Sequence, residues 1–186
     1  MKKEIIISGV GGQGLILCGT LLGEAAVIHD KKYATLSSEY GVETRGTFAK
    51  SDVIISDREI YFPDATQPNL VVCLAQAAYA RYSGAVPKGT LLLYNADEIT
   101  GDPARAGCEW GLSLTSMARA QGAAATINII TLGIIAGMTD TVTLAGAKDA
   151  VEEFFSPKGQ KIVQMNLGAL ELGYQTGMQL RRAASA

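Results

Sequence analysis

The sequence predicts an α/β fold: a Rossmann-like three-layer sandwich with a mostly parallel sheet and a helical C-terminal third. Short apolar segments rich in β-branched residues alternate with helical segments over residues 4–120. Alternation of this kind is typical of a parallel sheet covered by helices on both faces. From residue 126 onward only helical patterns follow. We therefore expect one domain over residues 1–186, with the sheet in its N-terminal part.

Composition narrows the class of protein. Hydrophobic residues make up 48% of the 186 residues, enough for a sizeable core, and the formal net charge of −2 gives no electrostatic reason to expect nucleic acid as a partner. Cys18, Cys73 and Cys108 stand far apart without a C-x-x-C pair, which argues against a disulfide framework, a zinc finger or an iron–sulfur cluster in this chain. We expect Cys18 and Cys73 to be buried, reduced thiols. No segment has the length and apolarity of a membrane span, so a cytoplasmic protein is expected.

The first half of the chain supplies three predicted strands. Glu4–Ser8 is short and apolar, as in a buried strand, and the nearly all-apolar run Leu15–Ile28 predicts a buried helix. His29 follows this helix and is expected to interact with its last carbonyls. The remaining elements are a strand at Tyr33–Leu36, a polar loop at Ser37–Thr47, and a strand-like stretch at Thr47–Ser56 that is either continuous or a hairpin turning at Lys50–Asp52.

The second half completes the sheet and adds the helical part. Apolar runs predict two more strands, glycine and proline residues mark the loops, and the later segments have helical spacing. In order, the predicted elements are a strand at Leu70–Leu74, a helix at Ala75–Tyr82, a strand at Thr90–Tyr94, a loop at Asn95–Glu109, and helices at Leu112–Ala120, Thr126–Met138, Ala147–Phe155 and Gln160–Leu180.

A glycine turn between the first strand and the first helix is the strongest functional motif. Gly9, Gly11 and Gly14 satisfy the pattern G-x-G-x-x-G. Glycines allow a tight turn and close approach of a ligand, and the helix start presents free N–H groups and a positive dipole end. The motif therefore predicts an anion site, and the pattern alone leaves the ligand open.

The surrounding residues do not favour a dehydrogenase. Such an enzyme has an acid at the end of its second strand, where this chain reads Tyr33–Ser38; Glu39 and Arg45 come later, in the predicted loop. The Walker pattern is absent as well. Four acidic residues stand apart in the sequence without the spacing of a catalytic or metal-binding group: Asp52, Asp57, Asp64 and Asp97. We expect a subunit that completes the active site of another chain.

Several segments in order resemble one known family. They are the strand and glycine turn Ile5–Gly14, the loop Ser38–Gly46, Val53–Ser56 with Ile60 and Pro63, Pro68–Val72, and Asn128 with Leu132 and Gly133. The chain is similar over nearly its whole length to the gamma subunit of 2-oxoacid:ferredoxin oxidoreductases, in the 2-oxoglutarate and pyruvate/ketoisovalerate branch. The specific element is the glycine turn paired with Tyr40-Gly41-x-Glu43-x-Arg45-Gly46.

The resemblance implies an activity for the complex rather than for this chain alone. The complex would convert a 2-oxoacid, with 2-oxoglutarate favoured, and coenzyme A to acyl-CoA and CO2, and would reduce ferredoxin. Thiamine diphosphate and iron–sulfur clusters would belong to its alpha and beta subunits and to an optional ferredoxin-like delta subunit. The alternatives are the small subunit of indolepyruvate oxidoreductase, or an independent nicotinamide- or flavin-binding Rossmann protein.

The resemblance also implies a shared site built from the turn and the loop. Its residues would be Gly9, Gly11, Gly12, Gln13, Gly14, Tyr40, Glu43, Arg45 and Gly46. The pyrophosphate of coenzyme A would rest on the N–H groups of the turn, with Arg45 paired to a phosphate. The alternative is a structural role, with Glu43 and Arg45 as an interface ion pair. Thr47 replaces a glycine found in many members of the family. When isolated, the chain is expected to form homo-oligomers through an exposed apolar patch.

Overall fold

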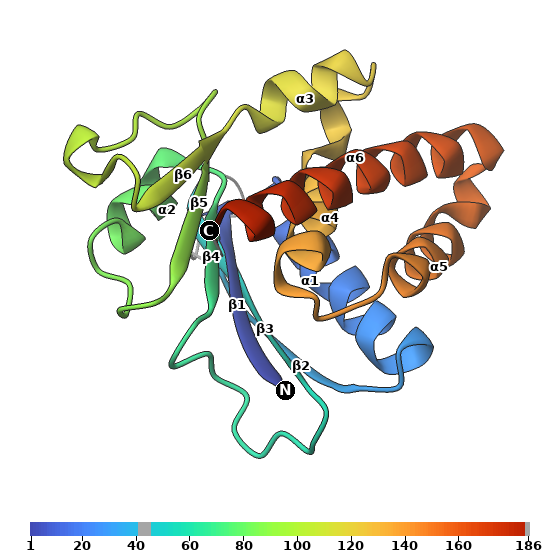
Figure 1. The fold of residues 1–186 in the computed structure, drawn as a ribbon. Coiled ribbons are helices and arrows are strands. Elements are labelled where there is room, and N and C mark those ends of the chain that lie inside the picture. The colour runs from blue at the N-terminus through green and yellow to red at the C-terminus, as the bar shows by residue number, and fades with distance from the viewer. Residues whose placement is uncertain (41–45, 185–186) are drawn as a thin grey trace.

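A computed structural model describes residues 1–40 and 46–184 (Figure 1). Its centre is a six-stranded sheet in the order β2-β3-β1-β4-β5-β6. The strands are β1 Lys2–Val10, β2 Tyr33–Tyr40, β3 Phe48–Ser56, β4 Leu70–Cys73, β5 Leu91–Asn95 and β6 Glu109–Leu112. Strand β3 is antiparallel to both of its neighbours, and the other five strands share one direction. The predicted α/β sandwich with a mostly parallel sheet is confirmed.

Helices cover both faces of the sheet. They are α1 Leu15–Glu24, α2 Gln76–Tyr82, α3 Leu114–Ala120, α4 Ile127–Thr139, α5 Leu144–Phe155 and α6 Gln160–Ala184. Short helical turns lie at Ala25–His29 (η1, a π-helix), Pro103–Arg105 (η2), Ala124–Thr126 (η3) and Ser156–Lys158 (η4). Figure 1 shows α1, α4, α5 and α6 on one side of the sheet and α2 on the other. None of the described helices has the length and apolarity required to cross a membrane.

The alternation of side chains along β1 divides the core between the two faces. Ile5 and Ile7 join the larger cluster with α1 and α4, whereas Ile6 joins the smaller cluster with Tyr79 of α2. Successive residues of a strand point to opposite faces, so an unbroken apolar run is what a doubly covered strand requires. Cys18 and Cys73 are buried free thiols, as predicted, and Cys108 is exposed.

Two local predictions were wrong, and one open alternative is decided. The predicted polar loop begins too early, because residues 37–40 continue β2 and pair with β3. Of the two alternatives for residues 47–56, the structure has the continuous strand β3 without a turn at Lys50–Asp52. Within it Lys50 pairs with Asp52 at 2.8 Å, and across to β2 it pairs with Glu39 at 3.6 Å. The pair Lys50–Glu39 crosses from β3 to β2, whereas Lys50 and Asp52 lie two residues apart on one strand, so charged side chains interact here in place of apolar ones. The short edge strand β6 occupies residues predicted as the end of a loop and the start of a helix.

Helices α4 and α6 meet backbone to backbone. Gly133 and Gly137 of α4 face Gly173 and Gly177 of α6. A Cβ atom on Gly173 would lie 2.1 Å from the Ile130 carbonyl oxygen, and one on Gly133 would lie 2.2 Å from the Leu170 carbonyl oxygen. Only glycine permits this approach, which makes the two helices one closely packed unit.

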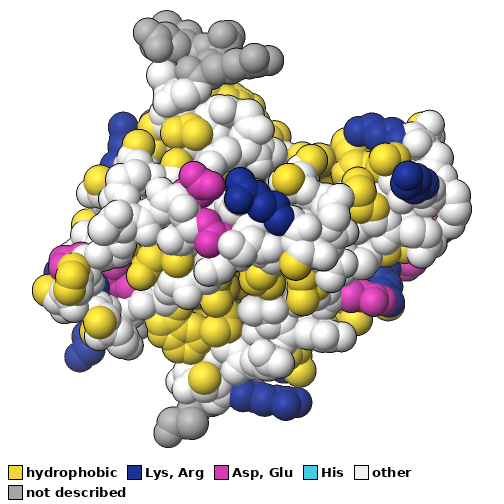
Figure 2. Space-filling model, turned by 90° about the horizontal axis from the view of Figure 1, so that it is seen from above, with side chains coloured by type: hydrophobic (Ala, Val, Ile, Leu, Met, Phe, Trp, Pro, Cys, Tyr) yellow, Lys and Arg dark blue, Asp and Glu magenta, His cyan; other side chains and the backbone are white. Residues whose placement is uncertain are grey.

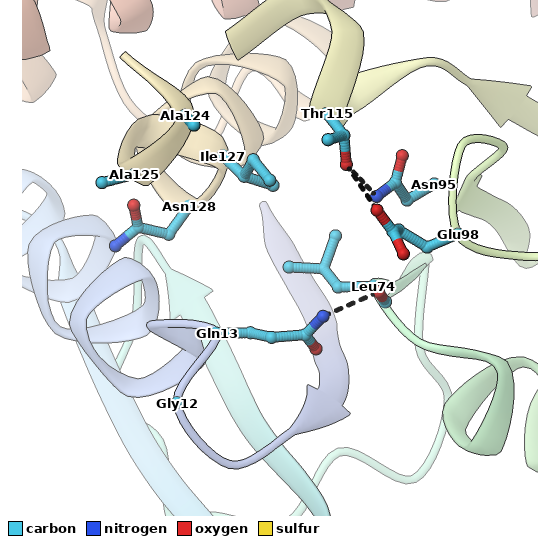
Figure 3. Close-up of a pocket in the computed structure, with 10 residues that line it drawn as sticks. All are labelled: Gly12, Gln13, Leu74, Asn95, Glu98, Thr115, Ala124, Ala125, Ile127 and Asn128. Atoms are coloured by element: carbon cyan, nitrogen blue, oxygen red, sulfur yellow. Dashed lines mark hydrogen bonds between the residues drawn. The ribbon is translucent and has the colours of Figure 1, made fainter. Parts of the chain in front are cut away.

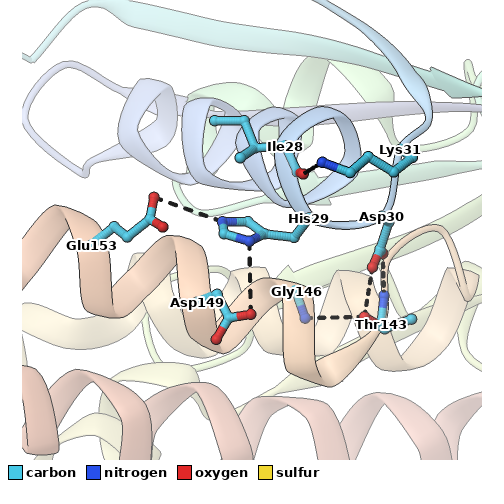
Figure 4. A network of polar contacts seen from close by, with 8 residues as sticks. All are labelled: Ile28, His29, Asp30, Lys31, Thr143, Gly146, Asp149 and Glu153. Carbon is cyan, nitrogen blue, oxygen red and sulfur yellow. Dashed lines mark hydrogen bonds and ion pairs between the residues drawn. The ribbon is translucent and has the colours of Figure 1, made fainter.

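A polar network ties the end of the first helical segment to α5 (Figure 4). Asp30 accepts hydrogen bonds from the backbone N–H of Thr143 at 2.6 Å and from its hydroxyl at 2.7 Å. His29 was predicted to interact with the last helical carbonyls, but its imidazole lies between Asp149 at 3.7 Å and Glu153 at 3.8 Å. Lys31 takes the predicted role instead, donating to the Ile28 carbonyl at 2.6 Å.

Candidate functional site

The glycine turn lies at the carboxyl end of β1, as predicted. Gly12 and Gly14 have φ angles of 96° and 74°, which are left-handed values that favour glycine. Gly14 is the N-cap of α1, so the helix begins directly after the turn. The N–H of Gly11 donates to the Thr47 carbonyl at 3.0 Å, which fixes the turn against the start of β3.

Gln13 stabilises the turn. Its Oε1 accepts the backbone N–H of Val10 at 2.9 Å, and its Nε2 donates to the Leu74 carbonyl, also at 2.9 Å. The side chain thus joins the ends of β1 and β4. A Cβ atom on Gly9 would lie 2.2 Å from Oε1 of Gln13. Gly9 and Gln13 therefore shape the turn through their contacts with each other and with the backbone.

Asn128 lies against the first turn of α1, and sequence reasoning did not select it as a site residue. The residue is 8% exposed as a whole, and a Cβ atom on Gly14 would lie 2.5 Å from its Nδ2. Gly14 is thus required both by its φ angle and by the proximity of this carboxamide. The available signal was an asparagine within the apolar segment that forms α4.

One cavity joins the glycine turn to the end of β2, and we call it the turn cavity. It has a volume of about 390 Å³ and is lined by Gly11, Gly12, Gly14, Tyr40 and the first residues of α1, among others. Tyr40 is 62% exposed. The structure therefore brings Tyr40 to the turn, and Gly46 directly precedes Thr47, the acceptor of the Gly11 N–H. Glu43 and Arg45 lie outside the described residues.

A second cavity, the strand-end cleft, has a volume of about 260 Å³ (Figure 3). It lies where β1, β4 and β5 end and where α3 and α4 begin. Its walls include Gly12 and Gln13 from the turn, Glu98 after β5, and Thr115 and Asn128 from the two helices. Ligands of open α/β sheets bind at this end of the strands.

The wall formed by β5 and α3 is an ordered hydrogen-bond network. Asn95 donates to the hydroxyl of Thr115 at 3.0 Å and accepts the backbone N–H of Leu114 at 3.1 Å. The Thr115 hydroxyl donates to Oε1 of Glu98 at 3.3 Å. Asp97 accepts the backbone N–H of Ser116 at 2.7 Å, and this bond lowers the pKa of its carboxyl group. The start of α3 is held by side chains from the loop after β5.

Neither of the two buried cysteines is an activated nucleophile. Burial raises the pKa of the Cys18 thiol, and it raises the pKa of the Cys73 thiol to about 12, so neither is a ready thiolate. The described residues contain no group of three side chains able to hold a metal ion. Figure 2 views the molecule from above Figure 1, and it shows acidic and basic side chains scattered rather than gathered into one patch.

The fold and the turn define a class of protein: a Rossmann-like domain with a glycine turn between its first strand and its first helix. Residues 4–176 match the family described as pyruvate ferredoxin/flavodoxin oxidoreductase. The chain belongs to this family.

Its relatives are subunits of such enzymes. The chain is 36% identical over 183 residues to the 2-oxoglutarate synthase subunit KorC of Methanocaldococcus jannaschii, covering 97% of this chain and 96% of that subunit. The gamma subunit of a keto/oxoacid ferredoxin oxidoreductase from Geobacter sulfurreducens has a TM-score of 0.79 at 34% identity, covering 95% of this chain and 99% of that one. The resemblance stated from sequence is confirmed, and the chain is a gamma-type subunit of this oxidoreductase family.

The fold also occurs within a longer polypeptide. A 2-oxoglutarate:ferredoxin oxidoreductase from Magnetococcus marinus, solved with 2-oxoglutarate, coenzyme A and succinyl-CoA, has a TM-score of 0.83 over 98% of this chain. The match covers 31% of that longer chain at 19% identity, so it supports the fold alone.

Proposed function

We propose that the chain is the gamma subunit of a 2-oxoglutarate:ferredoxin oxidoreductase. The complex would convert 2-oxoglutarate and coenzyme A to succinyl-CoA and CO2, passing two electrons to ferredoxin. The supporting observation is the 36% identity to a 2-oxoglutarate synthase subunit over 97% of the chain. Alpha and beta subunits, with or without a ferredoxin-like delta subunit, would supply thiamine diphosphate and iron–sulfur clusters. We place the complex in the cytoplasm and assign residues 1–186 to one gamma-type domain.

The substrate is tested with the assembled complex. Ferredoxin reduction is followed by absorbance with 2-oxoglutarate, pyruvate, 2-ketoisovalerate and indolepyruvate, each in the presence of coenzyme A. We expect kcat/KM for 2-oxoglutarate to exceed the others by at least about tenfold, a difference of about 1.4 kcal/mol in transition-state binding. A preference for pyruvate would assign the complex to a sister branch, and a preference for indolepyruvate would support the indolepyruvate oxidoreductase alternative.

We further propose that the turn cavity contacts the nucleotide end of coenzyme A. The start of α1 offers backbone N–H groups to the pyrophosphate. Tyr40 exposes 62% of its surface beside the turn, where its ring can stack on the adenine. Arg45, outside the described residues, would pair with a phosphate.

Calorimetric titration of coenzyme A into the assembled complex tests this contact. Tyr40→Ala should raise the Kd by about tenfold, because base stacking contributes about 1–3 kcal/mol. Arg45→Ala should raise it as well. Tyr33→Ala is a matched control, since Tyr33 is an exposed tyrosine at the opposite end of the same strand. Unchanged affinity in both Tyr40→Ala and Arg45→Ala would leave the turn and the loop with a structural role.

A further inference from the structure

A polar cavity on the hairpin of β2 and β3 shares no lining residue with the two cavities described above. It has a volume of about 410 Å³ and is lined by Ser37, Glu39, Lys50, Asp52 and Asp64, among others. The register pairs Ser37 with Asp52 and Glu39 with Lys50, so these four side chains share one face of the sheet. Asp64 comes from the segment between β3 and β4. We call this hollow the acidic cavity.

The acidic cavity holds more negative than positive charge. Its three carboxyl groups and one ammonium group give a formal net charge of −2, and Lys50 is the only basic residue among the described residues that line it. Lys50 is already shared between Asp52 and Glu39. Asp64 forms no ion pair with any of the residues that the structure describes. One lysine therefore leaves the cavity short of positive charge.

Asp52 is buried, and half of its carboxylate is unused. Its side chain is 5% exposed, and Oδ2 accepts a hydrogen bond from Lys50. Oδ1 is buried and has no hydrogen-bond partner within the described part of the chain. Burial raises the pKa of the Asp52 carboxyl group against the opposing effect of Lys50, and Glu39 and Asp64 raise it further. A second cation in the cavity would compensate for the hydration that this carboxylate has lost.

The geometry favours a guanidinium group over a single ion. The described residues form no group of three side chains that could hold a metal ion. A guanidinium group is planar and carries five N–H donors, so it can bridge carboxylates that lie apart. The Glu39 side chain is 59% exposed and that of Asp52 only 5%, so the acids extend from the surface into the sheet. The cavity therefore fits the long side chain of an arginine that enters from outside the molecule.

The neighbouring side chains favour an arginine of another polypeptide over a free cation. Among the described residues, the three most exposed large apolar side chains are Tyr61, Tyr40 and Phe62. Tyr40 directly follows Glu39 in the chain, and Tyr61 and Phe62 shortly precede Asp64. Exposed aromatic side chains together with arginine contacts are typical of protein–protein interfaces.

We propose that the acidic cavity receives an arginine side chain of a partner subunit in the oxidoreductase complex. The guanidinium group would bind Asp64 and Glu39 at the surface and balance the charge of Asp52 below them. The proposal rests on the assembly of this chain with other subunits, which is part of the proposed function. It does not depend on which 2-oxoacid the complex converts.

The affinity of the full chain for the remaining subunits, expressed together without it, tests this docking site. The Kd is measured by surface plasmon resonance at low and high salt. Glu39→Gln and Asp64→Asn should each raise the Kd by about threefold at low salt, as expected for exposed charge pairs, and less at high salt. Glu152→Gln is the matched control, because it removes one exposed charge from α5 and should leave the Kd unchanged.

Ser37→Arg separates docking from folding. It places an arginine of this chain beside Asp52, its register partner, and so supplies the missing cation from within. The Tm of the isolated chain should rise, while the Kd for the other subunits should increase by more than about tenfold, because the cavity is then filled. Misfolding cannot explain weaker assembly in a variant whose Tm is higher.

The outcomes separate this proposal from the proposed function. If the wild type assembles, but Ser37→Arg does not weaken assembly and Asp64→Asn behaves like Glu152→Gln, the docking site is wrong and the subunit assignment stands. A wild type that does not assemble with the other subunits would overturn both. Calorimetry with spermidine and arginine methylamide covers the free cation: tight binding to the isolated chain that Asp64→Asn abolishes, with assembly unaffected, would also overturn the docking site.

Discussion

Asp97 shows how a single side chain prepares the wall of the strand-end cleft. It accepts both the backbone N–H and the hydroxyl of Ser116, and so caps the first turn of α3. The backbone bond from Ser116 is the main cause of its lowered pKa, relative to the ordinary value of 3.8. A carboxylate with a lowered folded-state pKa stabilises the fold above its unfolded pKa, and this contribution is lost as the pH falls through the folded value.

Asp97→Asn should therefore weaken the dependence of stability on acid pH. The wild type should lose more unfolding free energy than the variant as the pH is lowered from about 5 to below the ordinary Asp pKa of 3.8. Urea unfolding of the full chain at a series of pH values measures the difference. Ser116→Ala keeps the backbone donor and should retain most of the pH dependence. Parallel curves for the wild type and Asp97→Asn would contradict this account.

Asn128 and Gly14 show what sequence reasoning at single residues misses. The glycine pattern predicts Gly14 as part of the turn. The second requirement for glycine at this position is the nearby carboxamide of Asn128, a residue 114 positions further along the chain. In the sequence, only the family resemblance points to Asn128. A polar residue in an apolar helix can face a cleft, or it can bond to the backbone of its own helix, as Thr131 does. The neighbouring sequence does not distinguish these two cases.

At the scale of elements, the glycine contact between α4 and α6 should control stability. Gly173→Ala places a Cβ atom 2.1 Å from the Ile130 carbonyl oxygen, so the helices must separate. We expect a loss of about 3 kcal/mol in unfolding free energy, the upper range for overpacking of a close contact. Thermal and urea unfolding measure it.

A matched control lies on the same helix. The nearest atom to a Cβ on Gly168 would be Gln121 Oε1 at 3.7 Å, an ordinary contact. Gly168→Ala should therefore be neutral or stabilise by up to about 1 kcal/mol through helix propensity. A similar loss for both variants would contradict the assignment of the effect to the backbone contact between α4 and α6.

The hairpin of β2 and β3 shows why polar strands escape prediction. Residues 37–40 and 50–52 contain serines and charged residues, a composition typical of loops. Their strand structure depends on the pairing of Ser37 with Asp52 and of Glu39 with Lys50 across the hairpin. Such cross-strand partners become evident only when the register is known.

At the scale of the whole molecule, the layer architecture was predictable and the cavities were only partly so. Apolar runs such as Ile5–Ile7 and Leu70–Val72 can be stable only between two helical layers, and this constraint predicts the sandwich. The glycine turn followed from its local pattern. The strand-end cleft combines residues from the glycine turn, β5, α3 and α4, whose convergence depends on strand order, and strand order is not encoded in any local pattern.

The antiparallel strand β3 has a consequence for what this fold can be made to bind. In dinucleotide-binding folds the second strand is adjacent to the first, so an acid at its end reaches the ribose above the glycine turn. Here β3 separates β2 from β1, which moves the end of β2 to about 9–10 Å from β1, twice the usual strand spacing. Placing an aspartate at the end of β2 would therefore not create an NAD site. The strand order, and not the absence of one acidic residue, separates this chain from the dehydrogenases whose glycine pattern it shares.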